Sequence, residues 1–309
     1  MDLTLSKSAM RRALELMEGG GHETLDELIE ELIVERTARE VGEREAPDVV
    51  GTELMPDAAT APEFAEPAPS PRGTLLFLTN RLSPIKVATR VLAGLSKTGS
   101  WPTVEQFQDR AAGVAREVGL RLREEGRQDM SAQTRRWIGY PIGEDVDGSL
   151  RRFVFSFAID LDPGGAAGPM WMLGLANQIS GSRVALTEAG WRLASAHSPI
   201  LDGGEGTLGD DEAAILREGV ASLPDELAAS LEFLELVRRS GGAQSRLDGL
   251  LSVRHADWTG NRAIAERGAF LGRLGELGLV AVKGRGKTAR IEVTGLGRRF
   301  ETEHVREKE

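Results

Sequence analysis

Cysteine is absent from this chain of 309 residues. Without it the protein has no disulfide, no thiolate nucleophile and no cysteine-ligated zinc. Histidine is also scarce: the four histidines are scattered along the chain, with no helical i, i+4 pair and no short metal-binding spacing. We therefore expect neither a metal site nor another cofactor.

Long apolar runs are missing as well. No stretch of about 18 or more apolar residues occurs, so the sequence predicts no membrane span. The first residues lack the basic and then apolar order of a secretory leader. We expect a cytoplasmic protein without a membrane partner, and the length of the chain suggests two or three domains.

Positive charge is in short supply overall, because 38 Lys and Arg face 48 Asp and Glu and the net charge is -10. The deficit lies in residues 1–72, which hold seven basic and 17 acidic side chains and so account for the whole excess. Residues 254–290, in contrast, carry eight Lys or Arg against three acidic side chains. Local charge decides where a phosphate backbone can dock, so this stretch is the candidate nucleic-acid contact.

Residues 1–41 have the pattern of one strand followed by two helices. Residues 2–6 alternate polar and apolar as a half-buried strand does, and a helical pattern follows that ends at three consecutive glycines. Thr24, with Glu27 three residues on, then forms a capping box at the start of a second helical pattern. This order resembles the ribbon-helix-helix family.

That resemblance implies that Thr4 and Ser6 face the major groove of DNA and that Lys7 adds positive charge nearby. Asp2 departs from the family pattern, because its carboxylate would repel phosphate. A two-helix dimerisation hairpin explains the same residues. Both interpretations imply a homodimer, because about forty residues bury too little surface to be stable alone.

Residues 42–72 are rich in Ala, Glu and Pro and show no apolar period. Such a segment cannot bury enough surface to offset its chain entropy. We expect a disordered acidic linker here.

Residues 73–196 predict an α+β domain. Ser83-Pro84 marks a helix start, and Thr103 to Gln106 has capping-box spacing at the start of another helix. The aromatic and β-branched run at 152–159 predicts a strand. Asp160 and Asp162 follow it, but without a third ligand at a recognisable spacing they fit a solvated turn better than a metal site.

A short internal repeat links this domain to the end of the chain. The triplet Leu-Gly-Leu at 173–175 precedes the segment 183–187, just as Leu-Gly-Leu at 277–279 precedes 290–294. Each copy predicts a helix that ends at the triplet, then a hairpin, then a Thr that caps a helix with Gly three residues later. Two related units are the simplest account, and the uncharged turn at 180–182 indicates that the first unit is architectural or contacts protein.

Residues 208–305 predict a further domain. Two helices are expected at 211–222 and 225–239, and nine acidic side chains against one Arg between 205 and 235 should keep this part away from a duplex. A third helix is expected at about 261–277, with a core side made by Phe270, Leu271, Leu274 and Leu277. It stops at Leu-Gly-Leu and leads into a basic, Gly-rich hairpin at 283–287.

That order of parts resembles the winged helix-turn-helix superfamily, in which the second helix of the pair enters the major groove and the wing follows the neighbouring backbone. Helical phasing places Arg262 and Arg273 together on the solvent side, opposite the core, and Arg267 near a turn between two helices. The stretch 284–287 gives only weak support for a nucleotide-binding loop, because it is too short for a Walker A sequence. The helix residues expected to contact DNA are Arg262, Arg267 and Arg273, and the hairpin residues are Lys283, Arg285, Lys287 and Arg290.

The expected fold class is α+β and mostly helical, with two winged-helix-like units and an N-terminal strand-helix-helix dimerisation module. The sequence shows no nucleophile and base pairing, no metal spacing and no phosphate loop, so we expect no enzymatic activity. The expected function is that of a dimeric transcriptional regulator that binds double-stranded DNA. The alternative is a scaffold or accessory subunit of a larger DNA-associated complex, in which the winged helices bind protein.

Overall fold

The computed structural model describes residues 63–67, 71–75, 78–96, 100–128, 136–162, 165–256, 258–284 and 289–306. The chain divides into two units, Met1–Val49 and Val50–Glu309, and every described residue belongs to the second. The predicted N-terminal module, with Thr4, Ser6 and Lys7, therefore lies outside the described residues.

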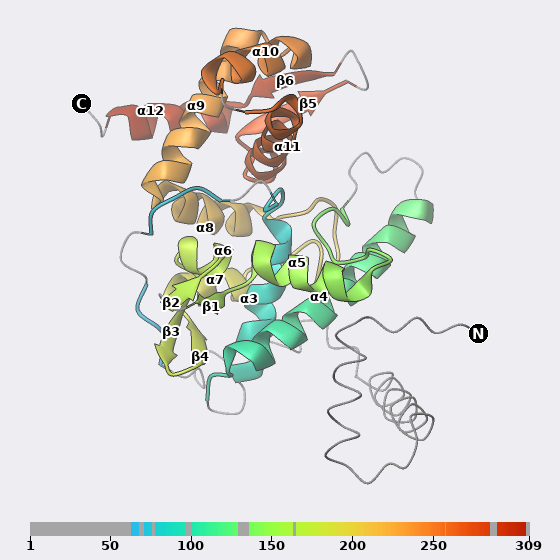
Figure 1. Ribbon diagram of the computed structural model, residues 1–309, viewed down its shortest axis with the longest axis vertical. Helices are drawn as coiled ribbons and strands as arrows, with labels where there is room; N and C mark the ends of the chain where they lie inside the picture. The colour runs from blue at the N-terminus through green and yellow to red at the C-terminus, as the bar shows by residue number, and fades with distance from the viewer. Residues whose placement is uncertain are drawn as a thin grey trace, which may run out of the picture. The chain divides into compact units, whose positions relative to one another are not determined.

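The described chain is mostly helical, with three two-stranded antiparallel sheets, which agrees with the broad α+β expectation. We call residues 83–195 the first lobe and residues 210–306 the second lobe (Figure 1). The first lobe contains α3 (Ser83–Leu95), α4 (Val104–Gln128), α5 (Val146–Phe157), β1 (Asp160–Asp162), β2 (Gly165–Ala167), α6 (Pro169–Met172), β3 (Ala176–Ser180), β4 (Arg183–Leu186) and α7 (Glu188–Ser195). The second lobe contains α8 (Asp210–Ala221), α9 (Pro224–Ser240), α10 (Gln244–Arg254), α11 (Gly260–Glu276), β5 (Val280–Lys283), β6 (Arg290–Val293) and α12 (Gly295–Arg306).

The starts of α3 and α4 follow from local signals in the sequence. Pro84 occupies the first turn of α3, where its missing amide hydrogen costs nothing. At the start of α4 the side chains of Thr103 and Gln106 each accept a hydrogen bond from the backbone amide of the other, at 3.3 and 3.1 Å. This reciprocal pair is a capping box, so both predicted helix starts are confirmed.

The strand predicted at 152–159 is wrong, because residues 152–157 form the second half of α5. The side chain of Asp145 accepts from the amide of Gly148 and so caps the helix. Phe153 and Phe157, four residues apart, then lie on one buried face with ring centroids 5.5 Å apart. The aromatic content that suggested a strand instead forms one face of a helix, with an i, i+4 contact.

The internal repeat is confirmed, because the hairpins of the two lobes make equivalent hydrogen bonds. Thr187 donates from its hydroxyl to the carbonyl of Gly174 and accepts from the amide of Gly190, at 2.6 and 3.1 Å. Thr294 makes the equivalent pair of hydrogen bonds, at 2.6 and 2.9 Å, to the carbonyl of Gly278 and from the amide of Gly297. The two copies therefore close their hairpins and cap the next helix in the same way.

A third backbone segment joins each hairpin. Thr103, the residue before α4, pairs with Arg183 of β4, and Ala243, the residue before α10, pairs with Arg290 of β6. The second lobe has the order helix, short extended pairing, helix, helix, hairpin and Thr-capped helix. The first lobe has the same order, except that β1, β2 and α6 are inserted between α5 and the β3–β4 hairpin. In Figure 1 the second of these sets is formed by α9, α10 and α11 around β5 and β6, followed by α12.

Buried charges connect α3 to the elements that follow the first hairpin. Lys86 Nζ lies 3.2 Å from Oε1 of Glu212 on α8 and donates to the carbonyl of Leu193 in the last turn of α7. Burial lowers the pKa of Lys86 to about 8, although Glu212 opposes that shift. One turn along α3, Arg90 pairs with Asp202, so the loop between the lobes is also held.

A carboxylate of the second lobe caps the first helix of the first lobe. Glu276, in the last turn of α11, accepts hydrogen bonds from the amides of Leu82 and Ser83, at 2.5 and 3.0 Å, and from the Ser83 hydroxyl, at 2.9 Å. Helix N-termini carry unpaired amides and a partial positive charge, so a carboxylate stabilises them. The end of α11 and the start of α3 are therefore joined directly.

The predicted disordered linker at 42–72 is too long, because residues 63–67 are docked on the first lobe. The amide of Ala65 donates to the carbonyl of Leu186 on β4 at 2.9 Å, and the indole of Trp101 donates to the carbonyl of Glu63 at 2.9 Å. Ala65 is buried, and Phe64 packs against Trp191 at a centroid distance of 5.6 Å. Backbone groups make both hydrogen bonds, and composition gives no signal for such contacts.

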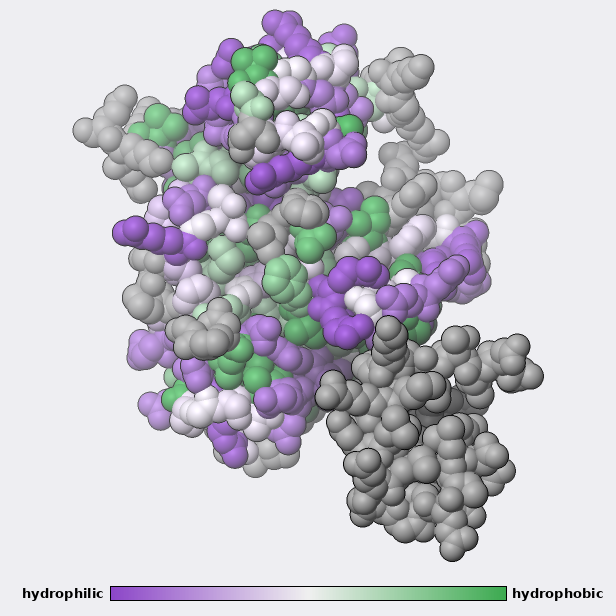
Figure 2. Space-filling view, viewed as in Figure 1, coloured by the Kyte–Doolittle hydropathy of each residue, from purple (hydrophilic) through white to green (hydrophobic). Residues whose placement is uncertain are grey.

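None of the helices in the described part of the chain combines the length and the apolar character needed to span a bilayer. On the face shown in Figure 2, hydrophobic residues form small patches separated by hydrophilic ones.

Candidate functional site

The candidate site is the part of the second lobe formed by α11 and the β5–β6 hairpin. Thr259 caps α11 by accepting from the amide of Arg262 at 3.3 Å. The helix then runs without interruption to Glu276, so Arg267 does not mark a turn between two helices, and the turn lies instead between Arg254 and Gly260. The sequence patterns did not predict α10, which precedes this turn.

Arg262 is exposed, as expected. Its guanidinium lies 5.3 Å from the centroid of the Trp258 ring, and its Nε is 3.9 Å from Oε1 of Glu266 one turn along the helix. The side chain is 54% exposed, so these contacts leave most of it accessible. Cation–π contacts and surface ion pairs of this kind contribute only modestly to stability.

Arg267 is mostly buried and forms an ion pair with Asp248 of α10. The exposed fractions of the two side chains are 18% and 38%. This pair connects α10 to α11, so Arg267 has a role inside the lobe.

The prediction that Arg273 faces solvent is wrong, because its side chain is 1% exposed. Its Nη2 lies 3.0 Å from Oε1 of Glu226 on α9, and its Nη1 donates to the carbonyl of Thr79 at 2.9 Å. The guanidinium also lies 4.7 Å from the centroid of the Phe270 ring. Arg273 sits at the flank of the apolar stripe of α11, and the chain at residues 79–82 covers that flank.

The same covering segment explains one glycine of α11. A Cβ on Gly272 would lie 2.0 Å from the carbonyl oxygen of Asn80, so only glycine lets the two backbones approach so closely. Glu226, the partner of Arg273, also accepts from the amide of Leu75 at 2.9 Å. Burial raises the pKa of Glu226, and the positive charge of Arg273 opposes that rise. Arg273 is therefore an internal tie between α11, α9 and the segment before α3.

The hairpin keeps part of its predicted positive surface. Lys283 Nζ lies 2.6 Å from Oε2 of Glu292 across the strands, but the two side chains are 68% and 47% exposed. Arg290, at the start of β6, is exposed as well. Arg285 and Lys287 lie outside the described residues. The exposed ion pair is worth little, so Lys283 and Arg290 remain open to a partner.

The solvent face of α11 differs from the predicted one, which included Arg273. Within the helix, five residues at alternating spacings of three and four form one stripe, which we call the outer seam: Asn261, Ile264, Gly268, Leu271 and Gly275. Leu271 is half-buried and packs partly against the core, as predicted, whereas the other four are exposed, with Ile264 54% exposed. No member carries a charge. The signal that could have found the seam is its spacing, once the core side is placed on the Ala263, Phe270 and Leu274 face.

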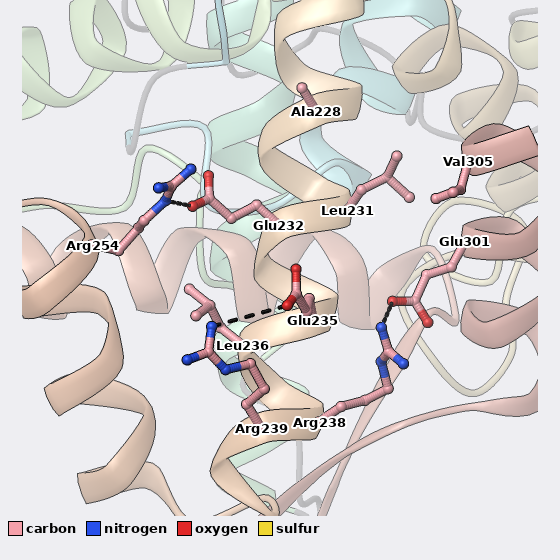
Figure 3. A pocket seen from close by; sticks show the side chains of 10 residues that line it. All are labelled: Ala228, Leu231, Glu232, Glu235, Leu236, Arg238, Arg239, Arg254, Glu301 and Val305. Atoms are coloured by element: carbon pink, nitrogen blue, oxygen red, sulfur yellow. Dashed lines mark hydrogen bonds and ion pairs between the residues drawn. The ribbon is translucent and has the colours of Figure 1, made fainter. Parts of the chain in front are cut away.

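A groove beside this site runs between α9, α10 and α12 and has a volume of about 580 Å³ (Figure 3). Four apolar and six charged residues line it. Each of the six charged side chains that line it faces a partner of opposite sign: Glu232 with Arg254, Glu235 with Arg239, and Glu301 with Arg238. The groove therefore offers no uncompensated charge to a ligand.

A smaller pocket lies between α9, α10 and α11. Two stacked aromatic pairs line it: Phe233 with Phe270 at 5.1 Å, and His255 with Trp258 at 3.9 Å. Its volume of about 180 Å³ lies below the range of about 300–1,000 Å³ that is typical of ligand sites. Among the described residues, no group of three His, Asp or Glu side chains could hold a metal ion.

Comparisons of the chain with protein-family models, with characterised proteins and with solved structures gave no match. The geometry of the site is therefore the basis for inferring function.

Proposed function

We propose that this protein is a non-enzymatic adaptor with two winged-helix-like units, and that its second unit binds another protein through the outer seam of α11. The order of elements in each lobe supports the winged-helix part of the proposal. In the second lobe α9, α10 and α11 precede the β5–β6 hairpin, and Ala243 supplies the short third pairing. Such an adaptor corresponds to the alternative from the sequence, a scaffold or accessory subunit of a larger DNA-associated complex.

One observation carries the choice of protein over DNA as the partner of α11. A helix that reads the major groove needs side chains that reach base edges or phosphates, above all arginine. The outer seam presents Ile264 and Leu271 with two glycines, and its only polar side chain is Asn261. Apolar, uncharged surface is typical of the core of a protein interface.

The arginines of α11 support the same choice, because most of their charge is used inside the lobe. Arg273 is buried against Glu226, and Arg267 is paired with Asp248. Arg262 is accessible, but it lies against Trp258, away from the outer seam. A duplex approaching the seam would therefore meet little positive charge from the helix.

A second candidate function rests on the hairpin. Lys283, Arg285, Lys287 and Arg290 fall within eight residues that contain no acidic side chain. Basic side chains close together in the sequence attract phosphate with strong salt dependence and without sequence preference. In that case the protein is a cytoplasmic, dimeric regulator that holds double-stranded DNA through its wing, and α11 serves another contact.

The proposal is tested by a photo-crosslinking amino acid placed at Ile264 and, separately, at Arg290, in cells that express the full chain. An adduct at Ile264 that protease digests and nuclease leaves intact is the expected result. A nuclease-sensitive adduct at Ile264 would overturn the proposal. A nuclease-sensitive adduct at Arg290 alone would support the second candidate beside the first.

The second candidate has its own measurement, the anisotropy of labelled random duplex DNA across a salt series. If the wing binds phosphate, replacing Lys283, Arg285 and Lys287 by Ala flattens the slope of log affinity against log salt by roughly 2 to 3. Ile264→Ala is the matched control, because it alters the seam and leaves the wing charges in place. No binding by the intact protein at low salt would exclude the regulator.

A further inference from the structure

The spacing of the outer seam is that of a coiled-coil contact. Helices that pack along a seam place residues at alternating intervals of three and four, the a and d positions of a heptad. Asn261, Gly268 and Gly275 are seven residues apart, and Ile264 and Leu271 form the second row. The seam therefore has small or polar residues in one row and large aliphatic residues in the other.

The glycines of the seam have no role inside the described part of the chain. Glycine is among the poorest helix formers, so an interior glycine weakens a helix unless close packing requires it. Gly272 is explained by Asn80, but no atom lies within 4 Å of the place where a Cβ on Gly268 or Gly275 would be. The recesses at these two positions open to solvent.

We infer that a second copy of this chain occupies the outer seam, with the two α11 helices antiparallel; this inference rests on the proposed function. A two-fold axis between residues 269 and 270 places Ile264 opposite Gly275 of the second copy and Leu271 opposite Gly268 of the second copy. Ile264 and the exposed part of Leu271 then fill the recesses above these glycines. In an isologous interface one surface must complement itself, and this order of large and small residues does so.

The competing arrangements fit less well. A parallel pair in register would set glycine against glycine and leave empty space, and voids in a contact lose packing energy. The charged side chain that flanks the seam, Arg267, is paired with Asp248, so antiparallel pairing adds no unbalanced charge. β5, which packs against α11, adds Val282, 53% exposed, to the apolar surface of this lobe.

The absence of cysteine makes the arrangement directly testable in the full chain. Ile264→Cys and Gly275→Cys are prepared as separate proteins, mixed and oxidised mildly. The mixture is expected to form a disulfide-linked dimer, and neither protein alone is expected to do so. A dimer from Ile264→Cys alone would indicate a parallel pair, and no dimer from the folded mixture would also overturn the inference.

Gly268→Leu provides the second variant. Its side chain fills the recess and, because nothing lies near that position, the monomer should fold normally. Crosslinking of the Cys mixture should fall by about tenfold or more when both proteins carry it. Gly249→Leu, at an exposed glycine of α10 that also has no neighbour within 4 Å, is the matched control and should leave the crosslink unchanged.

The outcomes separate this inference from the proposed function. If the photo-crosslinker at Ile264 captures a different protein and the Cys mixture gives no dimer, the second copy is excluded while the adaptor stands. If the crosslinker captures nucleic acid, the adaptor itself fails. The crosslink depends on which two positions meet, so dimerisation through any other part of the chain does not imitate the result.

Discussion

Arg273 Nη2 on α11 lies 3.0 Å from Oε1 of Glu226 on α9, and both side chains are 1% exposed. The pair is held further by the carbonyl of Thr79 and the amide of Leu75, so it joins two helices to the segment before α3. Buried pairs of this kind are costly to break, because removing one partner leaves the other charge without compensation. A basic residue that looked like a DNA contact is therefore part of the interior.

Arg273→Leu should lower the free energy of unfolding by about 3–5 kcal/mol at neutral pH, because Glu226 is left buried and unpaired. Urea unfolding followed by circular dichroism measures the change. Arg239→Leu is the matched control, since Arg239 is 60% exposed and lies 3.9 Å from Glu235. Its loss should stay below about 1 kcal/mol. Equal losses in the two variants would contradict the assignment of Arg273 to the interior.

The loss in Arg273→Leu should also depend on pH. Burial raises the pKa of Glu226, so its carboxyl group binds a proton more tightly in the folded state than in the unfolded chain. The stability from such a group is present below its ordinary pKa and is lost as pH rises through the folded-state pKa. Without Arg273 the pKa of Glu226 rises further. The difference in the free energy of unfolding between the wild type and Arg273→Leu should therefore be smaller at about pH 5 than at about pH 8. A difference independent of pH would count against an ionised Glu226.

Lys86→Met tests the buried charge between α3 and α8. Burial lowers the pKa of Lys86 to about 8, below its ordinary 10.5, so between these values the unfolded chain binds more protons than the folded one. Stability rises with pH wherever that holds. The difference in the free energy of unfolding between the wild type and Lys86→Met should therefore increase from pH 8 to pH 10. Lys283→Met, at a lysine that is 68% exposed, should show no such increase in the same urea titrations.

Glu276→Ala removes the acceptor for two amides and one hydroxyl at the start of α3. We expect a loss of about 2 kcal/mol, the upper range for removing a helix cap. Glu276→Gln keeps one oxygen in place and should lose less. Differential scanning calorimetry measures both, with the exposed Glu303→Ala as a control. An unchanged Tm in Glu276→Ala would show that the contact between the lobes contributes nothing.

Gly190→Ala and Gly297→Ala test the shared construction of the two hairpins. A Cβ at these positions would lie 1.9 and 2.2 Å from the carbonyl oxygens of Leu175 and Leu279. Because a backbone atom must move, each variant should lose about 2 kcal/mol or more. Gly249→Ala has open space and should instead gain up to about 1 kcal/mol. Thermal unfolding compares the three, and a neutral Gly297→Ala would contradict the equivalence of the hairpins.

Features that depend on neighbours along the chain were predictable from the sequence. The proline at the start of α3, the Thr103 and Gln106 capping box, and the Thr-capped helices after both hairpins involve residues no more than a few positions apart. Helix α5 was missed although its cap is also local. Two phenylalanines four residues apart fit one face of a helix, and their β propensity alone favours a strand.

Features that depend on distant contacts were not predictable. Arg273 and the carbonyl that it binds are separated by 194 residues, so no spacing rule relates them. The docked segment at 63–67 contributes backbone groups to its hydrogen bonds with Leu186 and Trp101, and the composition of the segment does not predict such bonds. The spacing of the outer seam of α11 is local, but which of its neighbouring glycines is covered depends on Asn80, which lies over Gly272 and not over Gly268 or Gly275.

The hydrogen bonds of Glu276 connect α11, which has an exposed face, directly to the start of α3. Gly275 faces solvent and its neighbour Glu276 holds the first turn of α3, so one peptide unit separates the proposed contact face from a helix cap in the other lobe. Adjacent residues of a rigid helix cannot move independently. A partner that turned α11 about its axis would pull the carboxylate from the amide of Ser83, and occupancy of one lobe would then be transmitted as strain to the first helix of the other.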